Sequence, residues 1–348
     1  MTIGQLQWRF NMSRSIFSSL LCARYLGTRK LSATALGIML CAAPMAWPMS
    51  PTDDVQAPEQ QKAQELCIAA ERGDIEAIQR LCQDGADPNI RWSIVGQEVT
   101  PLYCAVCQRK HKSIEALCAH GADPNETMLT TRGTYATPLY VACQIGDVKS
   151  VRELCRWGAN PDKGVVTKDD TQDIPPLCVA SRMGHHLVVK KLREYGASLD
   201  KAEVVSRKAR KTPLIHAINE GHVGVVKALL LGDGHADATL SQSNNLSPLI
   251  AAAYARHTSR SAMIKLILNA MQPSAATLDC CGVDEEHAAQ FTAAFVNQKT
   301  QVHHTTALHG AFVHRDTEAA ALLLHAGADP TIKNANGDSA WLYGATAS

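Results

Sequence analysis

The sequence predicts an all-α solenoid, in which helix–turn–helix units with extended fingers stack into a curved array. Two motifs recur along the chain, and the residues between them have helical spacing. The first motif is Thr-Pro-Leu or a close variant, beginning at Thr100, Thr137, Pro175, Thr212 and Ser247. The second is Gly-Ala-Asp or a close variant, beginning at Gly85, Gly121, Gly158, Gly196 and Gly327. Such repetition at a nearly fixed period is the signature of a repeat architecture.

The residues after each Thr-Pro-Leu motif are those of a short helix. The Thr or Ser hydroxyl can accept a hydrogen bond from a free backbone N–H of the first turn, and Pro lacks an N–H where none is needed. Small residues follow, which allows neighbouring helices to approach closely. A glycine then ends this first helix, because a positive backbone torsion is expected there. These glycines are Gly73, Gly146, Gly184 and Gly221.

A second helix is expected between that glycine and the Gly-Ala-Asp motif. Its apolar residues have helical spacing, as in Val188, Val189 and Leu192. Cys82, Cys118 and Cys155 lie three residues before a loop glycine, where Leu324 lies in the last unit. A position that accepts either Cys or Leu is a packing position, because a free Cys behaves as a small hydrophobe. The Gly-Ala-Asp segment then turns the chain into the finger.

About seven units are expected in a domain spanning residues 61–348. They start near Gln64, Thr100, Thr137, Pro175, Thr212, Ser247 and Thr306, and a half unit at 338–342 closes the array. The sixth unit lacks its Gly-Ala-Asp motif and leads into an insertion at residues 271–305. One extra helix is expected within it, from Glu285 to Asn297.

This double motif resembles the ankyrin repeat, whose hallmark is Thr-Pro-Leu-His followed by small residues and later Gly-Ala-Asp. The resemblance implies that stability comes from stacking, because one unit cannot bury its own apolar face. The sequence departs from the family in two respects. The motif His occurs only as His309, so the family's hydrogen bonds from this His between units should mostly be absent. The spacing also exceeds the family's usual period of about 33 residues, so the fingers should be longer.

The resemblance also implies where a partner protein binds. Contacts are expected from residues just before the Thr-Pro pair and just before the inter-helix glycine. The first set is Val99, Ala136, Ile174, Lys211 and Leu246, and the second is Gln144, Ile145, Arg182, Met183, Asn219 and Glu220. Ile145 and Met183 are apolar at positions expected to face water, which favours them as anchors.

Other chemistry has little support in the sequence. No nucleophile motif and no phosphate-binding glycine loop occur, so the chain is predicted not to be an enzyme and to need no cofactor or metal. The pair Cys104 and Cys107 lacks the further ligands of a zinc site, and packing is the favoured interpretation. A metal-dependent enzyme using Cys280, Cys281 and the histidines of the insertion stays as an alternative.

The charge pattern favours a protein partner. The net charge is +1, and the basic run between Lys201 and Lys211 lacks interleaved aromatic residues. Nucleic acid is therefore not the expected partner. This run is expected to form a solvated finger, with an acidic partner surface as the alternative.

Residues 1–60 are expected to be a targeting leader and linker. The first 52 residues contain no Asp or Glu, carry several Arg, and include an uncharged stretch from Leu31 to Ser50. This pattern is typical of a secretory signal, although an organelle transit peptide or a bacterial effector signal has a similar composition. The protein is therefore expected to be secreted, periplasmic or translocated into a host cell, with a cytoplasmic location as the alternative. A membrane contact is expected only if the leader is retained as an anchor.

The leading hypothesis is a non-catalytic scaffold for protein–protein interaction, acting as an exported effector through its concave face. The alternative is a regulatory or protective protein of the producer's own cell or periplasm. Cysteines at packing positions favour a reduced final environment.

Overall fold

The computed structural model describes residues 53–345 except for 95–96, 131–133, 168–172, 207–208, 232–235, 241–245 and 272–284. The chain divides into two compact units. Unit 1 comprises Met1–Asp123 with Met128–Arg132, and unit 2 comprises Pro124–Thr127 with Gly133–Ser348. The described residues form paired short helices with short strands only in the fingers, which confirms the predicted all-α repeat fold.

Unit 1 contains two helix pairs. Its elements are α2 (Asp53–Arg72), α3 (Ile75–Gln83), β1 (Trp92–Ile94), β2 (Gln97–Val99), α4 (Pro101–Cys107), α5 (His111–Ala119) and β3 (Met128–Leu129). Helix α2 packs against α4, and α3 packs against α5. Buried Cys67, Val99 and Met128 form a cluster that joins the helices to the finger strands. Helix α2 begins at Asp53, inside the segment expected to be leader and linker.

Unit 2 continues the same pattern. Its elements up to the sixth repeat are β4 (Thr134–Ala136), α6 (Pro138–Ile145), α7 (Val148–Arg156), β5 (Val165–Thr167), β6 (Asp173–Ile174), α8 (Pro176–Arg182), α9 (His186–Glu194), β7 (Glu203–Ser206), β8 (Ala209–Lys211), α10 (Pro213–Asn219) and α11 (Val223–Leu230). The remainder comprises α12 (Pro248–Tyr254), α13 (Arg260–Met271), α15 (Glu285–Val296), α16 (Ala307–Val313), α17 (Thr317–His325) and α18 (Ala340–Ala345).

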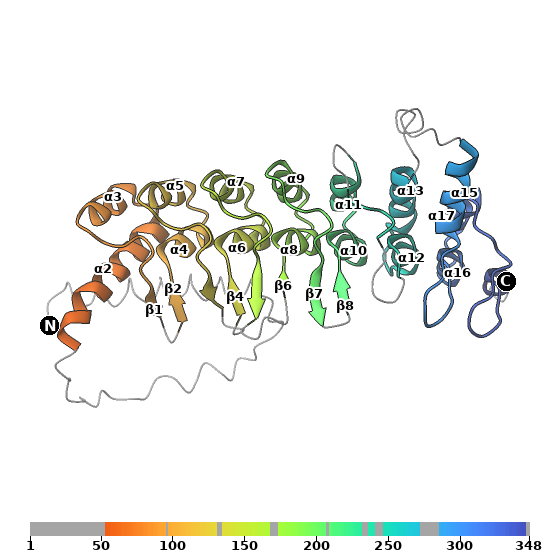
Figure 1. The fold of residues 1–348 in the computed structure, drawn as a ribbon, viewed down its shortest axis with the longest axis horizontal. Helices are drawn as coiled ribbons and strands as arrows, with labels where there is room; N and C mark the ends of the chain where they lie inside the picture. The colour runs from red at the N-terminus through yellow and green to blue at the C-terminus, as the bar shows by residue number, and fades with distance from the viewer. Residues whose placement is uncertain are drawn as a thin grey trace. The chain divides into compact units, whose positions relative to one another are not determined.

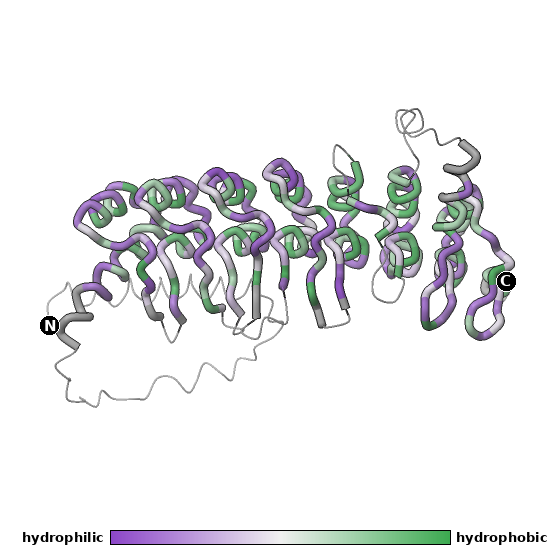
Figure 2. Tube along the Cα trace, in the orientation of Figure 1, coloured by the Kyte–Doolittle hydropathy of each residue, from purple (hydrophilic) through white to green (hydrophobic). Residues whose placement is uncertain are grey.

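The helices of unit 2 lie in two rows. First helices α6, α8, α10, α12 and α16 pack against one another, and second helices α7, α9, α11, α13 and α17 form the other row (Figure 1). Figure 2 shows that α11 and α13 are mainly hydrophobic, whereas α7 and α9 carry many hydrophilic residues. The core lies between the rows, where Leu154, Leu177, Leu192, Leu214 and Leu229 are fully buried.

Local chemistry fixes the start and end of the first helices. The hydroxyl of Thr137 accepts a hydrogen bond from the backbone N–H of Tyr140, and Thr100, Thr212 and Ser247 cap their helices in the same way. Pro175 has no side chain that could do so, and α8 begins without this bond. Gly146 ends α6 with a φ of 79°. This conformation is unfavourable for any residue that has a Cβ atom, so glycine is preferred there. These caps confirm the predicted roles of the motif residues.

The fingers differ from plain extended turns, because their extra residues form antiparallel strand pairs. In unit 2, β4 pairs with β5, β5 with β6, and β7 with β8. Ala136 opposes Val165, and both side chains are buried. A finger longer than usual therefore gains backbone hydrogen bonds and some apolar burial.

Side-chain hydrogen bonds connect each finger to the next. Asn125 donates to the carbonyl oxygen of Gly158 at 3.0 Å, and its Oδ1 accepts from the N–H of Asn160 at 2.7 Å. Asn297 makes the same pair of bonds to Gly327 and Asp329, at 2.9 and 2.7 Å. Asn297 directly follows α15, so the helix expected in the insertion supplies the connection that the missing Gly-Ala-Asp motif would have made.

Candidate partner-binding surface

Ten of the eleven residues predicted to contact a partner lie in unit 2, and Val99 lies in unit 1. Gln144 and Ile145 end α6, Arg182 and Met183 end α8, and Asn219 and Glu220 end α10. We call these six residues the first-helix end surface. Because α6, α8 and α10 pack side by side, equivalent positions form two rows, one of Gln144, Arg182 and Asn219 and one of Ile145, Met183 and Glu220.

The exposure of these residues differs along the rows. Met183, Asn219 and Glu220 are exposed, whereas Gln144, Ile145 and Arg182 are half-buried. The Met183 side chain, at 41% exposure, is the large apolar group that water reaches most freely on this surface. The apolar anchor predicted from the sequence is therefore available at Met183 and only partly available at Ile145.

The residues before the Thr-Pro pair are less accessible than predicted. Val99 is at the end of β2 and Ala136 at the end of β4, and both are buried. Their prediction as contact residues was therefore wrong, because the finger strands of this chain cover them. Ile174 in β6 and Lys211 in β8 are half-buried.

Arg182 belongs to a buried charged cluster beside the first-helix end surface. Its Nη1 lies 3.6 Å from Oε2 of Glu203, and the same carboxylate oxygen is 2.5 Å from Nε2 of His216. Burial alone would raise the pKa of Glu203. The hydrogen bond from His216 and the charges of His216, Arg182 and Lys211 outweigh it and lower this pKa below its ordinary value. The cluster holds the guanidinium of Arg182 toward the finger strand β7.

Histidines join successive repeats by donating hydrogen bonds to backbone carbonyl groups near the ends of the first helices. Nε2 of His185 donates to the carbonyl oxygen of Gln144 at 3.2 Å, and His222 donates to that of Arg182 at 3.1 Å. His257 donates to the carbonyl oxygen of Ile218 at 2.7 Å. Within one repeat, His185 and His222 are only polar residues that directly follow the inter-helix glycine, and no role was predicted for them from the sequence. The missed signal is the recurrence of His at the repeat period.

The basic finger is partly neutralised within the chain. Nζ of Lys201 lies 3.2 Å from Oδ2 of Asp173 and donates to the carbonyl oxygen of Asp162 at 2.7 Å. Arg210 is exposed and Lys211 is half-buried. Arg207 and Lys208, the other basic residues of this run, lie outside the described residues.

The described residues contain no group of three or more His, Cys, Asp or Glu placed to hold a metal ion. Cys104 and Cys107 are half-buried in α4. Cys280 and Cys281 lie outside the described residues, and His303 and His304 are exposed. Over the same described ranges, no helix combines the length and hydrophobicity needed to cross a bilayer.

Two family models match the chain, both describing ankyrin repeats. One, covering three repeat copies, matches residues 52–128, and a single-repeat one matches residues 135–164, 210–243 and 303–335. Together these matches cover half of the chain. Residues left unmatched include the repeat that begins at Pro175, where Thr is replaced, and residues 271–302 of the insertion. No curated protein matches the chain in sequence.

Proposed function

Because the chain belongs to the ankyrin-repeat family, whose members typically bind other proteins without catalysing a reaction, we propose that it holds a partner protein against the first-helix end surface. The observation that carries this proposal is the 41% exposure of Met183 in the middle of the surface. An exposed thioether flanked by polar groups can pack against many apolar side chains, which suits an adaptable binding surface.

The neighbouring residues define the chemistry of the partner. Ile145 extends the apolar area on one side of Met183, and Glu220 and Asn219 make the other side polar. Arg182 is restrained by Glu203 at 3.6 Å, so it offers a pre-ordered cation at the border of the apolar area. A partner with an apolar residue for Met183 and an acidic or carbonyl group for Arg182 fits this arrangement.

The experiment removes the apolar pair and measures partner binding. The partner is captured with the full chain and identified by mass spectrometry, and its kinetics are then measured on a biosensor. Ile145→Ala combined with Met183→Ala should weaken binding by roughly 2 kcal/mol, mainly through faster dissociation. Leu187→Ala is the matched control, because Leu187 is an exposed leucine on the second helix α9. Normal binding by the double variant would show that the first-helix end surface is not the site.

We also propose that the protein is exported or targeted before it binds its partner. The acid-free, Arg-containing composition of residues 1–52 supports this. Determining the mature N-terminus of the protein from its source cells tests the proposal. A mature chain that retains its first residues in the producer's cytosol would favour the alternative of a regulatory scaffold in that cell.

A further inference from the structure

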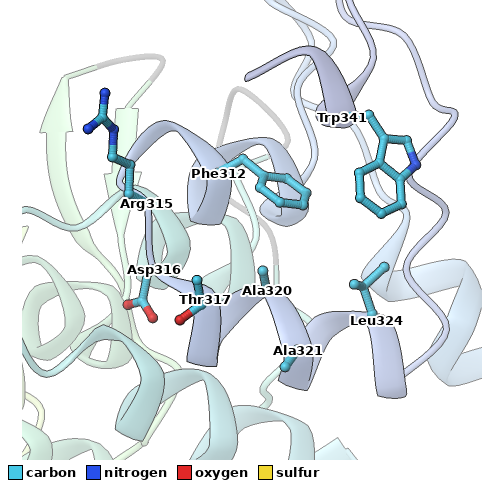
Figure 3. A pocket seen from close by; sticks show the side chains of 8 residues that line it. All are labelled: Phe312, Arg315, Asp316, Thr317, Ala320, Ala321, Leu324 and Trp341. Carbon is cyan, nitrogen blue, oxygen red and sulfur yellow. The ribbon is translucent and has the colours of Figure 1, made fainter. Parts of the chain in front are cut away.

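The last repeat in the described chain leaves an apolar pocket open to water. The pocket has a volume of about 430 Å³ and is lined by Phe312, Arg315, Asp316, Thr317, Ala320, Ala321, Leu324 and Trp341 (Figure 3). Trp341 of α18 faces Phe312 of α16, with ring centroids 5.8 Å apart. Helix α17, carrying Ala320, Ala321 and Leu324, forms the opposite wall.

The repeat that contains α11 shows how a leucine at one of these positions is covered. Leu324 is equivalent to Leu230, since each lies at the same distance from the residue that caps its helix. Leu230 is 3% exposed where α13 packs against α11, but Leu324 is 37% exposed. The difference is that no second helix follows α17 in the described residues.

On the wall formed by α18, Trp341 is likewise more exposed than the equivalent residue of an earlier repeat. It lies at the second position of α18, where α16 has Leu308. Leu308 is 1% exposed in α16, which packs against α12, α18 and the second helix of its own repeat, α17, whereas Trp341 is 54% exposed. The group that fits both walls is therefore a helix that lies beside α17 and pairs with α18, as the second helix of a repeat pairs with its first.

Trp341, Leu342 and Leu324 are all exposed at this end of unit 2. Leu324 and Trp341 both line the pocket, so its apolar wall is open to a partner side chain.

Charge indicates which kind of helix fits. Within the described residues, the structure records no ion pair for Arg315, while Asp316 is held by Arg260 at 2.8 Å. That ion pair joins the first residue of α13 to the residue that caps α17, so the N-termini of neighbouring second helices lie together. Arg315 occupies the turn position that Gly146 and Gly184 occupy in earlier repeats, and like them it has a positive φ. At those glycines, the residue that begins the next second helix lies over the turn, His185 over Gly146 and His222 over Gly184. A docked helix would thus bring its N-terminal residues to Arg315.

We propose that the pocket between Leu324 and Trp341 is a docking site for an amphipathic helix of a partner protein, seated like the second helix of a further repeat. Its apolar face packs on Leu324, Ala321 and Trp341. An acidic residue in its first turn pairs with Arg315, and the same residue is favoured there by the dipole of its own helix. This site is separate from the first-helix end surface and does not depend on it.

The test uses the full chain and two synthetic peptides of the sequence of α13, the helix that covers Leu230. One peptide keeps Arg260 and the other carries Arg260→Glu. Both contain a lactam between Lys265 and an aspartate introduced by Asn269→Asp, on the exposed side of α13, because an unconstrained peptide of this length is marginally helical. Binding is measured by fluorescence anisotropy.

The acidic peptide should bind the wild-type chain at least about fivefold more tightly than the basic one, and Arg315→Glu should reverse this order. Leu324→Lys and Trp341→Ala should each weaken binding at least about tenfold. Leu187→Lys, a change at an exposed leucine on α9, should change it less than about twofold. Melting curves of the variants should match the wild type, because Leu324 and Trp341 are exposed.

Three results would overturn the proposal. One is no saturable binding up to about 1 mM peptide, which corresponds to an interaction too weak to be specific. Another is binding that Leu324→Lys leaves unchanged. The third is a dimer of the full chain in sedimentation that Leu324→Lys dissociates, since this would assign the pocket to a second copy of the chain.

Discussion

The imidazole of His222 lies directly over Gly184, and its Nε2 donates a hydrogen bond to the carbonyl oxygen of Arg182, which is two residues before Gly184. A Cβ atom on Gly184 would come within 2.8 Å of that ring. Gly146 and His185 stand in the same relationship one repeat earlier, at 2.5 Å. The glycine of one repeat, because it has no side chain, therefore leaves space for the histidine of the next repeat, which makes the hydrogen bond.

This relationship predicts a coupling between the two residues. Gly184→Ala should cost about 2 kcal/mol, because a positive φ and a steric clash both oppose it. His222→Ala should cost about 1 kcal/mol for the lost hydrogen bond. In the double variant, the cost of Gly184→Ala should fall by about 1 kcal/mol, because the clash has gone. Urea unfolding of the four proteins measures this coupling.

Gly196→Ala and His186→Ala are the matched controls. Gly196 has a φ of 79° but no atom within 4 Å of an added Cβ, so its substitution measures the backbone strain alone. His186 is exposed and should be replaceable without loss. Strictly additive costs in the Gly184 and His222 variants would contradict the proposed packing.

The glycine–histidine contact also shows where sequence reasoning ends. The capping roles of Thr100, Thr137 and Thr212 could be predicted because they depend on residues within one turn of helix. The role of His222 depends on how one repeat is placed on the next. A sequence interpretation restricted to one repeat therefore finds only a polar residue after a glycine.

The surface predicted to bind a partner also combines features that the sequence predicts with features that it does not. Motif position correctly placed Met183 on an exposed helix end, since that position depends only on the repeat pattern. It could not predict that the strands of longer fingers bury Val99 and Ala136, or that Glu203 holds Arg182. Both depend on finger residues that the standard repeat lacks.

Glu203 predicts a pH-dependent contribution to stability. Its folded-state pKa is lowered, so this contribution is present above the ordinary carboxyl pKa of about 4.3 and is lost as pH falls through the folded-state value. Glu203→Gln should destabilise the protein by about 2 kcal/mol at pH 7, because it removes the charge facing Arg182 and His216. The difference from wild type should shrink toward pH 3.

Thermal melts of wild type and Glu203→Gln across this pH range measure the effect. Glu194→Gln is the control, because Glu194 is an exposed carboxylate that pairs with Lys191 on α9. Its effect should be small at every pH. A constant difference between Glu203→Gln and wild type from pH 7 to pH 3 would show that the carboxylate charge is not what stabilises the cluster.

The thiols of Cys118, which is buried, and Cys155, which is half-buried, are predicted to be unreactive in the folded protein. Burial raises the pKa of Cys155 to about 12, and burial together with the charge of Asp123 raises that of Cys118 to about 12. At pH 8 roughly one such thiol in 10⁴ is then a thiolate, the form that reacts with alkylating reagents. Alkylation of native protein, followed residue by residue with mass spectrometry, should therefore be slow at both positions and fast in denaturant.

In the described structure, neither Cys118 nor Cys155 forms a disulfide bond. Non-reducing digestion should accordingly recover these two as free thiols. Rapid labelling of Cys118 in native protein, or its recovery in a disulfide, would contradict the packing role inferred for this position.

Asn297 is predicted to stabilise the end of the array as much as a regular finger residue does. It has the same two bonds as Asn125, although it follows a helix of the insertion rather than a Gly-Ala-Asp turn. Asn297→Ala and Asn125→Ala should each cost about 1 to 2 kcal/mol, because each leaves a carbonyl oxygen and an N–H of the next repeat without these bonds. Asn269→Ala, at an exposed position of α13, should cost less than about 0.5 kcal/mol.

Urea unfolding compares the three variants, and hydrogen exchange at the N–H of Asp329 reports the local loss. If Asn297→Ala behaved like Asn269→Ala in both measurements, α15 would be an addition to the repeat array rather than a part of it.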